Sequence, residues 1–223
     1  MNQYIDALKR PFSDFKKLGI GFLFYVIPFV SIITRFFALG YELECARTAM
    51  KKQRKLPEWN NFGNLFVRGL LVLVIGIIYF IPLIILLIAF TWQFIPLLTP
   101  NMAPEEITNI VKDSIGYEKI IILFIVILLF TYILPIAILF FIRKYEFSDA
   151  FKIKEIFSKA FKWNYFGAWI FLGFYWVGIS LIVQGILYLT KEPYIVPIVL
   201  NSAAAIVFSI TKYSLFGRVF KDL

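Results

Sequence analysis

The chain of 223 residues is 61% hydrophobic and 19% aromatic, with a formal net charge of +9 and no histidine. Soluble domains are only about half apolar, so a mean hydropathy of +0.81 excludes that class. The single cysteine, Cys45, excludes an intramolecular disulfide. Without histidine or a second cysteine, the usual zinc, haem and iron–sulfur ligand sets are missing, and we expect no metal and no other cofactor.

The first apolar segment, residues 18–40, predicts a short hairpin and not a crossing helix. Pro28 divides it into arms of about ten to twelve residues, each reaching about 15–18 Å, whereas a hydrocarbon core is about 30 Å thick. We expect the second arm to continue past Gly40 toward Arg54 as one helix that projects into the cytoplasm. The preceding tail has an apolar face, typical of a helix lying on the membrane surface. That face consists of Tyr4, Ile5, Leu8, Phe12 and Phe15.

The runs Gly69 to Phe90 and Ile120 to Ile142 contain no charge and are long enough to cross a bilayer. Backbone groups in lipid must be paired within the segment, and the alternation of a barrel strand is absent, so each run predicts a helix. Two later apolar runs predict further crossings, the last at about 193–217. We therefore expect one all-α membrane domain over residues 1–223, a polytopic bundle with a re-entrant N-terminal hairpin and four full transmembrane helices.

An internal repeat is visible in the pentapeptides WNNFG at 59–63 and WNYFG at 163–167. Displacing the sequence by 104 residues aligns 36–69 with 140–173 without a gap and gives eleven identities in thirty-four positions. We interpret this as a parallel duplication with units of about 28–98 and 132–190. Each unit would be an apolar helix, a basic stretch, the motif Trp-Asn-x-Phe-Gly and a second apolar helix. We expect the aligned segments to superpose as helical pairs.

The repeated motif has a physical interpretation. Asparagine before a helix accepts from its first free amides, so Asn60 or Asn61, and Asn164, are candidate N-caps. Tryptophan prefers the headgroup level, which places Trp59 and Trp163 where the chain passes into the bilayer.

Three other segments carry local expectations. Gly69 and its equivalent Gly173 would let another helix approach closely. Residues 148–162, with a Ser148 cap and four lysines among phenylalanines, predict a second interfacial helix. Residues 99–116 predict a short amphipathic helix on the opposite face.

Basic residues set the predicted orientation. With a hairpin at the start, 19 of the 23 basic residues face the cytoplasm and three face outward, which the positive-inside rule favours. Both termini are then cytoplasmic. The alternative is five crossings with the N-terminus outside, which divides the charges 15 against seven.

The landmarks Gly40-Tyr41, Arg47, LPEWNNFGNLFVRGL from Leu56 to Leu70, Tyr79 and Pro82 resemble a prokaryotic family of multi-pass membrane proteins classed as a domain of unknown function. The run YILPIAILFF at 132–141 and Ala150-Phe151 resemble its second half. A glycine often stands in that family where this chain has Lys51 to Lys55, which argues against a tight turn here. The resemblance implies the plasma membrane of a prokaryote and no known activity, so it carries over no catalytic or binding residue.

The predicted cytoplasmic surface is the first candidate site. Two helix N-termini beside basic stretches would attract anionic headgroups. Nucleic acid is not expected, because topology already explains the charge. The candidate contacts with lipid or a partner are Arg54, Lys55, Trp59, Asn60, Lys159, Lys162, Trp163 and Asn164.

Polar residues inside apolar segments form the second candidate set. We expect the two cations to snorkel toward the headgroups, and no carboxylate or histidine is expected at depth to complete a proton relay. The members are Arg35, Gln93, Gln184, Asn201 and Lys212.

No spacing of Ser, Lys and Asp singles out a nucleophile with its base, so an enzyme is not expected. The sequence favours a non-catalytic scaffold or accessory subunit that contacts anionic lipids, another membrane protein or a second copy of itself. A small-solute transporter or channel component is the alternative, favoured by the duplication, the prolines within apolar segments and the glutamines Gln93 and Gln184.

Single cysteines introduced at Asn2 and at Asn109 test the orientation. In intact cells we expect an impermeant thiol reagent to label Asn109→Cys and not Asn2→Cys. External labelling at Asn2→Cys would contradict the hairpin.

Overall fold

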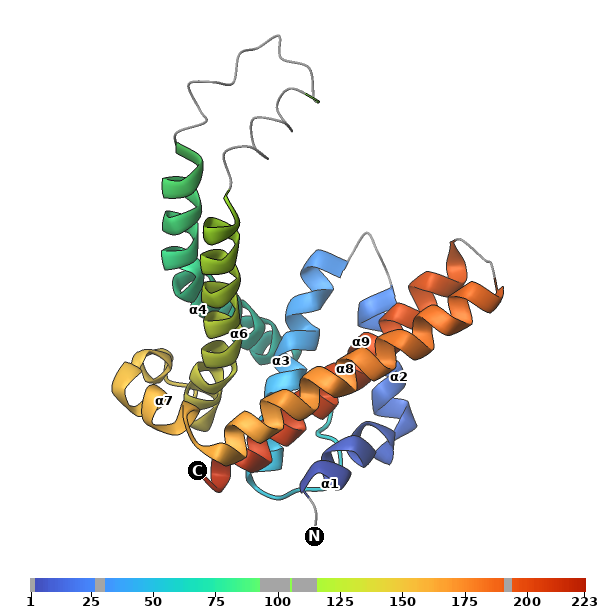
Figure 1. Ribbon diagram of the computed structural model, residues 1–223. Helices are drawn as coiled ribbons and strands as arrows, with labels where there is room; N and C mark the ends of the chain where they lie inside the picture. The colour runs from blue at the N-terminus through green and yellow to red at the C-terminus, as the bar shows by residue number, and fades with distance from the viewer. Residues whose placement is uncertain (1–2, 27–30, 93–104, 106–115, 191–193) are drawn as a thin grey trace. The chain divides into compact units, whose positions relative to one another are not determined.

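The computed structural model describes residues 3–26, 31–92, 105, 116–190 and 194–223. Every regular element within these residues is helical, which confirms the predicted all-α class. Four helices are long and apolar enough to cross a membrane (Figure 1): α4 (Phe62–Thr91), α6 (Tyr117–Lys144), α8 (Trp163–Thr190) and α9 (Ile195–Lys221). No more than 22% of the most apolar window of each helix is buried, so most of its surface is available to lipid.

The chain forms two compact units. Unit 1 comprises Met1–Val74 and Pro135–Leu223, and unit 2 comprises Ile75–Leu134. Unit 2 holds the later part of α4 and the earlier part of α6, with the rings of Phe80 and Phe130 5.9 Å apart. The amphipathic helix expected over 99–116 lies outside the described residues, except for Glu105 and Gly116.

The N-terminal hairpin is present in unit 1. It is preceded by α1 (Gln3–Lys9) and the 3₁₀ helix η1 (Arg10–Ser13), and its arms are α2 (Phe15–Val26) and α3 (Ser31–Met50). The 12 residues of α2 extend about 18 Å, too short for a crossing. The expected turn at Pro28 lies outside the described residues.

Helix α3 runs unbroken through Gly40, as predicted, but it does not project freely. Its second half is the centre of unit 1, because α2 and α9 pack against it. Five side chains in this second half are completely buried: Tyr41, Leu43, Cys45, Ala46 and Ala49. The expectation of a projecting helix is therefore wrong.

Three glycines bring helix backbones into direct contact around α3. A Cβ added to Gly40 would collide with the carbonyl of Leu65, and one added to Gly69 would collide with the carbonyl of Phe36. On the other side of α3, a Cβ on Gly217 would collide with the carbonyl of Ala46. The close approach predicted for Gly69 is thus confirmed. The same expectation for Gly173 is wrong, because a Cβ there would meet nothing within 4 Å.

The aligned segments of the repeat have different local structures. Helix α3 continues past Tyr41 to Met50, whereas α6 ends at Lys144 and Tyr145 takes a positive φ of 59°. Two short helices follow, η3 (Phe147–Phe151) and α7 (Ile153–Ala160), in place of the single helix expected over 148–162. Ser148 lies inside η3 and does not cap it, because Glu146 precedes that helix. Matching helical pairs are therefore not found in this stretch, and the duplication itself stays a prediction.

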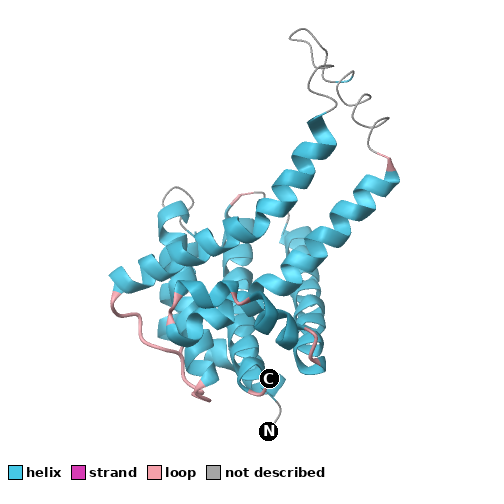
Figure 2. Ribbon diagram, turned by 90° about the vertical axis from the view of Figure 1, so that its left-hand side faces the viewer, coloured by secondary structure: helices cyan, strands magenta, loops and turns pink. Residues whose placement is uncertain are grey.

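The two ends of the chain meet. The side-chain amide of Gln3 donates to the carboxylate of Asp222 at 2.5 Å, and Figures 1 and 2 show both termini at the same end of unit 1. An odd number of crossings would place the termini on opposite faces of a membrane. This contact therefore favours the hairpin over the five-crossing alternative.

Replacing Gly69 with alanine tests the close approach of α4 to α3. The added methyl must push the two backbones apart, and overpacking of this kind costs about 1–3 kcal/mol. We expect Gly69→Ala to lower the unfolding temperature in detergent, and Gly173→Ala, its equivalent in the repeat, to leave that temperature nearly unchanged. Equal shifts for the two variants would contradict the contact.

Candidate functional site

The segment Leu56 to Trp59 is clamped onto the hairpin. The indole ring of Trp59 stacks on Tyr41, with ring centroids 3.7 Å apart and planes 7° from parallel, and its N–H donates to the carbonyl of Lys17 at 2.9 Å. The hydroxyl of Tyr41 donates to the carbonyl of Pro57 at 3.1 Å. Trp59 was predicted at the headgroup level, but these contacts show that it fastens the motif to α2 and α3.

Lys17 holds the same segment from α2. Its ammonium group donates to the carbonyl of Leu56 at 3.1 Å and pairs with Glu58 at 2.7 Å and Asp14 at 3.3 Å. The hydrogen bond to Glu58 is the main cause of the raised pKa of Lys17. In the sequence, Lys17 counts only as one of the basic residues that set the predicted orientation, so this structural role was not predicted.

Arg10 is the most deeply buried cation of this region, with 1% of its surface exposed. Its guanidinium donates to the carbonyls of Cys45, at 2.6 Å, and Lys55, at 3.2 Å. It also donates to the hydroxyls of Thr48 and Ser214. Burial lowers the pKa of Arg10 from its usual value, although a guanidinium remains charged. One side chain thus connects η1, α3, the segment after α3 and α9.

The motif also borders a polar cavity of about 480 Å³. Amide side chains line much of it: Gln53, Asn60, Asn61 and Asn64. Glu44 of α3 and Arg68 of α4 also line the cavity, and they form an ion pair.

Tyr145 anchors that ion pair from the end of α6. Its hydroxyl donates to Glu44 at 2.8 Å, and the guanidinium of Arg68 lies 3.8 Å from its ring centroid. Arg47 lies 4.8 Å from the same centroid. The positive φ of Tyr145 therefore occurs where three charged side chains fix the ring.

The structure shows which residue precedes each of the two helices, and a side-chain cap by Asn61 stays a prediction. Asn61 is the residue before α4, and its carbonyl accepts from the amide of Leu65 at 3.2 Å. Lys162, not Asn164, precedes α8, and its carbonyl accepts from the amides of Tyr165 and Phe166. The cap prediction is therefore wrong for Asn164, which lies in the first turn of the helix.

The eight predicted contact residues all lie in unit 1. Six are exposed: Arg54, Lys55, Asn60, Lys162, Trp163 and Asn164. Trp59 and Lys159 are half-buried, and the ammonium of Lys159 lies 5.0 Å from the ring centroid of Phe220. Figure 1 shows the segment after α3, α7 and the start of α8 at the end of unit 1 where the termini lie.

The predicted intramembrane set does not gather into one site. Gln184 and Asn201 are exposed, and the Asn201 amide donates to the carbonyl of Pro197 at 2.8 Å. Gln93 lies outside the described residues. Arg35 and Lys212 each lie over a tyrosine ring, that of Tyr25 at 4.4 Å and that of Tyr213 at 5.1 Å.

Glu42 is a buried carboxylate that the sequence did not predict, with 2% of its surface exposed. It accepts from the hydroxyl of Tyr25, which also lies 3.2 Å from the hydroxyl of Ser209. Arg35 and Lys212 are close enough to interact electrostatically with Glu42. The sequence predicts that the helix projects beyond Gly40, so the burial of Glu42 was not predicted.

The described part of the chain contains no group of three or more His, Cys, Asp or Glu side chains that could hold a metal. A protein-family model described as "Protein of unknown function (DUF4013)" matches residues 20–190. Comparison with curated proteins and with solved structures finds no match.

The clamp predicts different consequences for two tryptophans that the repeat aligns. Trp59→Phe loses the hydrogen bond to the Lys17 carbonyl and part of the stack on Tyr41, and we expect unfolding to become easier by about 1–2 kcal/mol. Trp163 is 83% exposed, so Trp163→Phe should change stability by less than about 0.5 kcal/mol. Thermal unfolding of both variants in one detergent measures the difference, and equal destabilisation would contradict the clamp.

Proposed function

The chain belongs to the DUF4013 family, whose function is unknown, so membership supplies no activity, and we propose that it is a non-catalytic scaffold or accessory subunit of a membrane. Its binding surface is the exposed basic and aromatic surface around the motif segment and α7. The ligands that suit this surface are anionic lipid headgroups. Another membrane protein or a second copy of the chain would dock beside them. The proposal places this surface on the cytoplasmic side of a prokaryotic plasma membrane.

The observation that carries the proposal is the composition of α7 and its flanks. The inner face of α7 buries Ile156 and Ala160. Its outer surface and C-terminal flank expose large apolar side chains next to cations: Ile153, Phe157, Phe161 and Trp163 beside Lys152, Lys154 and Lys162. Aromatic rings that enter the headgroup layer beside ammonium groups are typical of helices that lie on anionic membranes.

A buried carboxylate fixes the start of this surface. Asp149 in η3 is 1% exposed, and it pairs with Lys152 at 2.6 Å and Arg143 at 3.6 Å. The hydrogen bond from Lys152 is the main cause of the lowered pKa of Asp149. The carboxylate therefore stays ionised at neutral pH and holds the chain between α6 and α7 in place, while the lysines that follow remain exposed.

The segment after α3 supplies a second set of cations. Its four basic side chains are exposed: Lys51, Lys52, Arg54 and Lys55. Each basic residue near an anionic surface contributes about 1 kcal/mol of attraction. The clamp at Trp59 and the bond from Arg10 to the Lys55 carbonyl hold the segment in a fixed shape. A rigid basic surface loses less entropy on binding than a flexible tail.

The transporter or channel alternative is supported by one observation, the buried group around Glu42. Ionisable side chains inside membrane segments often mark ion pathways. Proton or solute flux in proteoliposomes that is lost in Glu42→Gln would favour this alternative over the scaffold.

Substitution of two exposed lysines tests the lipid proposal. In Lys55→Gln/Lys162→Gln, two contributions of about 1 kcal/mol disappear, and we expect about thirtyfold weaker retention of phosphatidylglycerol. The measurement is native mass spectrometry across a salt series, with phosphatidylcholine as the neutral lipid. The matched control is Lys112→Gln/Lys119→Gln. It removes the same charge from two of the three basic residues that are predicted to face outward. Equal loss in the two double variants, each with its insertion verified, would contradict the proposal.

A further inference from the structure

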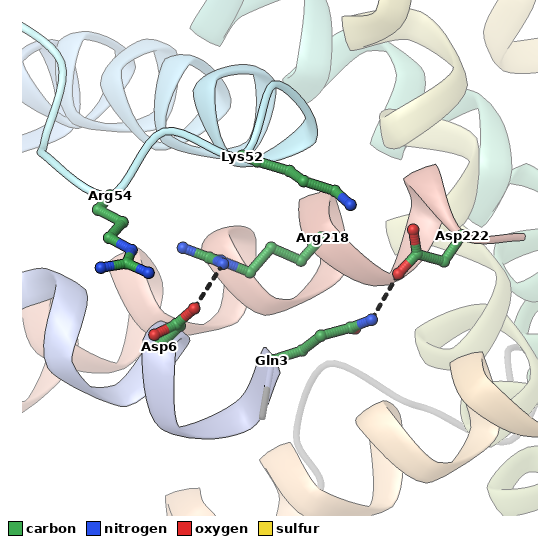
Figure 3. A pocket seen from close by; sticks show the side chains of 6 residues that line it. All are labelled: Gln3, Asp6, Lys52, Arg54, Arg218 and Asp222. Carbon is green, nitrogen blue, oxygen red and sulfur yellow. Dashed lines mark hydrogen bonds and ion pairs between the residues drawn. The ribbon is translucent and has the colours of Figure 1, made fainter. Parts of the chain in front are cut away.

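A cavity of about 290 Å³ lies where the start and the end of unit 1 meet. It is formed by α1, by the turn that follows α3 and by the last turns of α9 (Figure 3). Six residues line it: Gln3, Asp6, Lys52, Arg54, Arg218 and Asp222. This volume corresponds to roughly ten water molecules at about 30 Å³ each. It is large enough for a tetrahedral oxyanion together with part of the group that carries it.

Arg218 has donors that the described residues leave unused. Its side chain is 9% exposed, and its Nη1 pairs with Asp6 at 3.0 Å. The Nε and Nη2 atoms are buried and have no hydrogen-bond partner among the described residues. A guanidinium presents five N–H groups in a planar fork, and buried donors without an acceptor are unfavourable. An acceptor that reached this edge of the guanidinium would satisfy both donors.

The two other cations of the cavity come from the turn after α3. Lys52 has a positive φ of 59°, and its amide donates to the carbonyl of Ala49 at 2.8 Å to close the turn. The tight turn therefore exists with lysine where the resembling family often has glycine. Figure 3 shows the guanidinium groups of Arg54 and Arg218 pointing toward one another, while the side chain of Lys52 extends away from Arg54 toward Asp222.

The carboxylates of the cavity do not balance these charges. Asp6 is engaged by Arg218, and Asp222 accepts from the amide of Gln3. Three cations thus face two carboxylates. Arg10 adds further positive charge close by: burial lowers its pKa, and the charge of Arg218 adds to that effect. The local field therefore favours an additional anion.

We propose that this cavity binds one phosphate group, with the free edge of Arg218 and the side chain of Arg54 as donors and Lys52 as counter-charge. Planar guanidinium groups bind phosphate through paired hydrogen bonds, and an ammonium adds a point charge. The phosphate is either that of a phospholipid headgroup or that of a soluble phosphate compound. The inference deepens the proposed function by naming the group that is bound, but it depends on residues other than Lys162 and α7. Either proposal can therefore fail alone.

The test uses the full-length protein in a neutral detergent with inorganic phosphate as the probe. Calorimetric titration at constant ionic strength compares phosphate with chloride. We expect Lys52→Gln/Arg54→Gln to weaken phosphate binding at least tenfold. The matched control, Lys9→Gln/Lys16→Gln, removes the same charge from exposed positions outside both the cavity lining and the proposed lipid surface, and it should change phosphate affinity less than twofold. Arg218→Lys keeps a positive charge near Asp6 but loses the fork, and we expect it to weaken binding as strongly as the first double variant.

A second arm separates the two sources of phosphate. Native mass spectrometry from nanodiscs that contain phosphatidylglycerol counts retained lipid in the same variants. Loss of both probes in Lys52→Gln/Arg54→Gln supports a site open to soluble phosphate, and loss of the lipid alone supports a headgroup site. Equal loss in the two double variants would show diffuse surface charge and overturn the proposal. The proposal is also overturned if the parent protein binds neither inorganic phosphate nor phosphatidylglycerol. If lipid retention falls in Lys55→Gln/Lys162→Gln and in no other variant, the surface proposal stands and the cavity proposal fails.

Discussion

The position of one buried cation governs the arrangement of unit 1. Arg10 has four acceptors, two backbone carbonyls and two hydroxyls, and they come from α3, from Lys55 in the segment after α3 and from α9. A buried charge without such partners is strongly destabilising. The acceptors therefore have to converge on one point, and their convergence fixes the three elements relative to one another. The exposed basic segment after α3 and the cavity at Arg218 both lie beside this point.

Around that cation, helices are held by backbone contact and hydrogen bonds. Side chains gain little by leaving lipid for another apolar surface, so membrane helices associate through small residues and polar bonds. Unit 1 uses both. Glycines at positions 40, 69 and 217 bring backbones together, and Trp59 and Lys17 pair with backbone carbonyls of the opposing segment. Rigidity of this kind suits a surface whose binding depends on fixed positions of charge.

The sequence predicts the helical class, the four long apolar helices and the short hairpin, because apolar run length and Pro28 act locally. It does not predict the partners of Tyr41 and Tyr145, which the repeat aligns. The first stacks on Trp59, and the second binds Glu44 from 101 positions away. Identical residues thus have different roles, because distant partners decide them. Glu42 was missed for the same reason: Tyr25 and Ser209 bury it, and no pattern within α3 reveals either residue.

The separation of 204 positions between Arg10 and Ser214 has a consequence for the synthesis of the protein. Ribosomes add about 5–20 residues per second, so about 10–40 seconds pass between the synthesis of Arg10 and that of Ser214 in α9. Throughout that interval Arg10 lacks its acceptor from α9, and Glu42 lacks the covering that Ser209 provides. A chain truncated before α9 would carry both charges exposed, which distinguishes an unfinished molecule from a finished one.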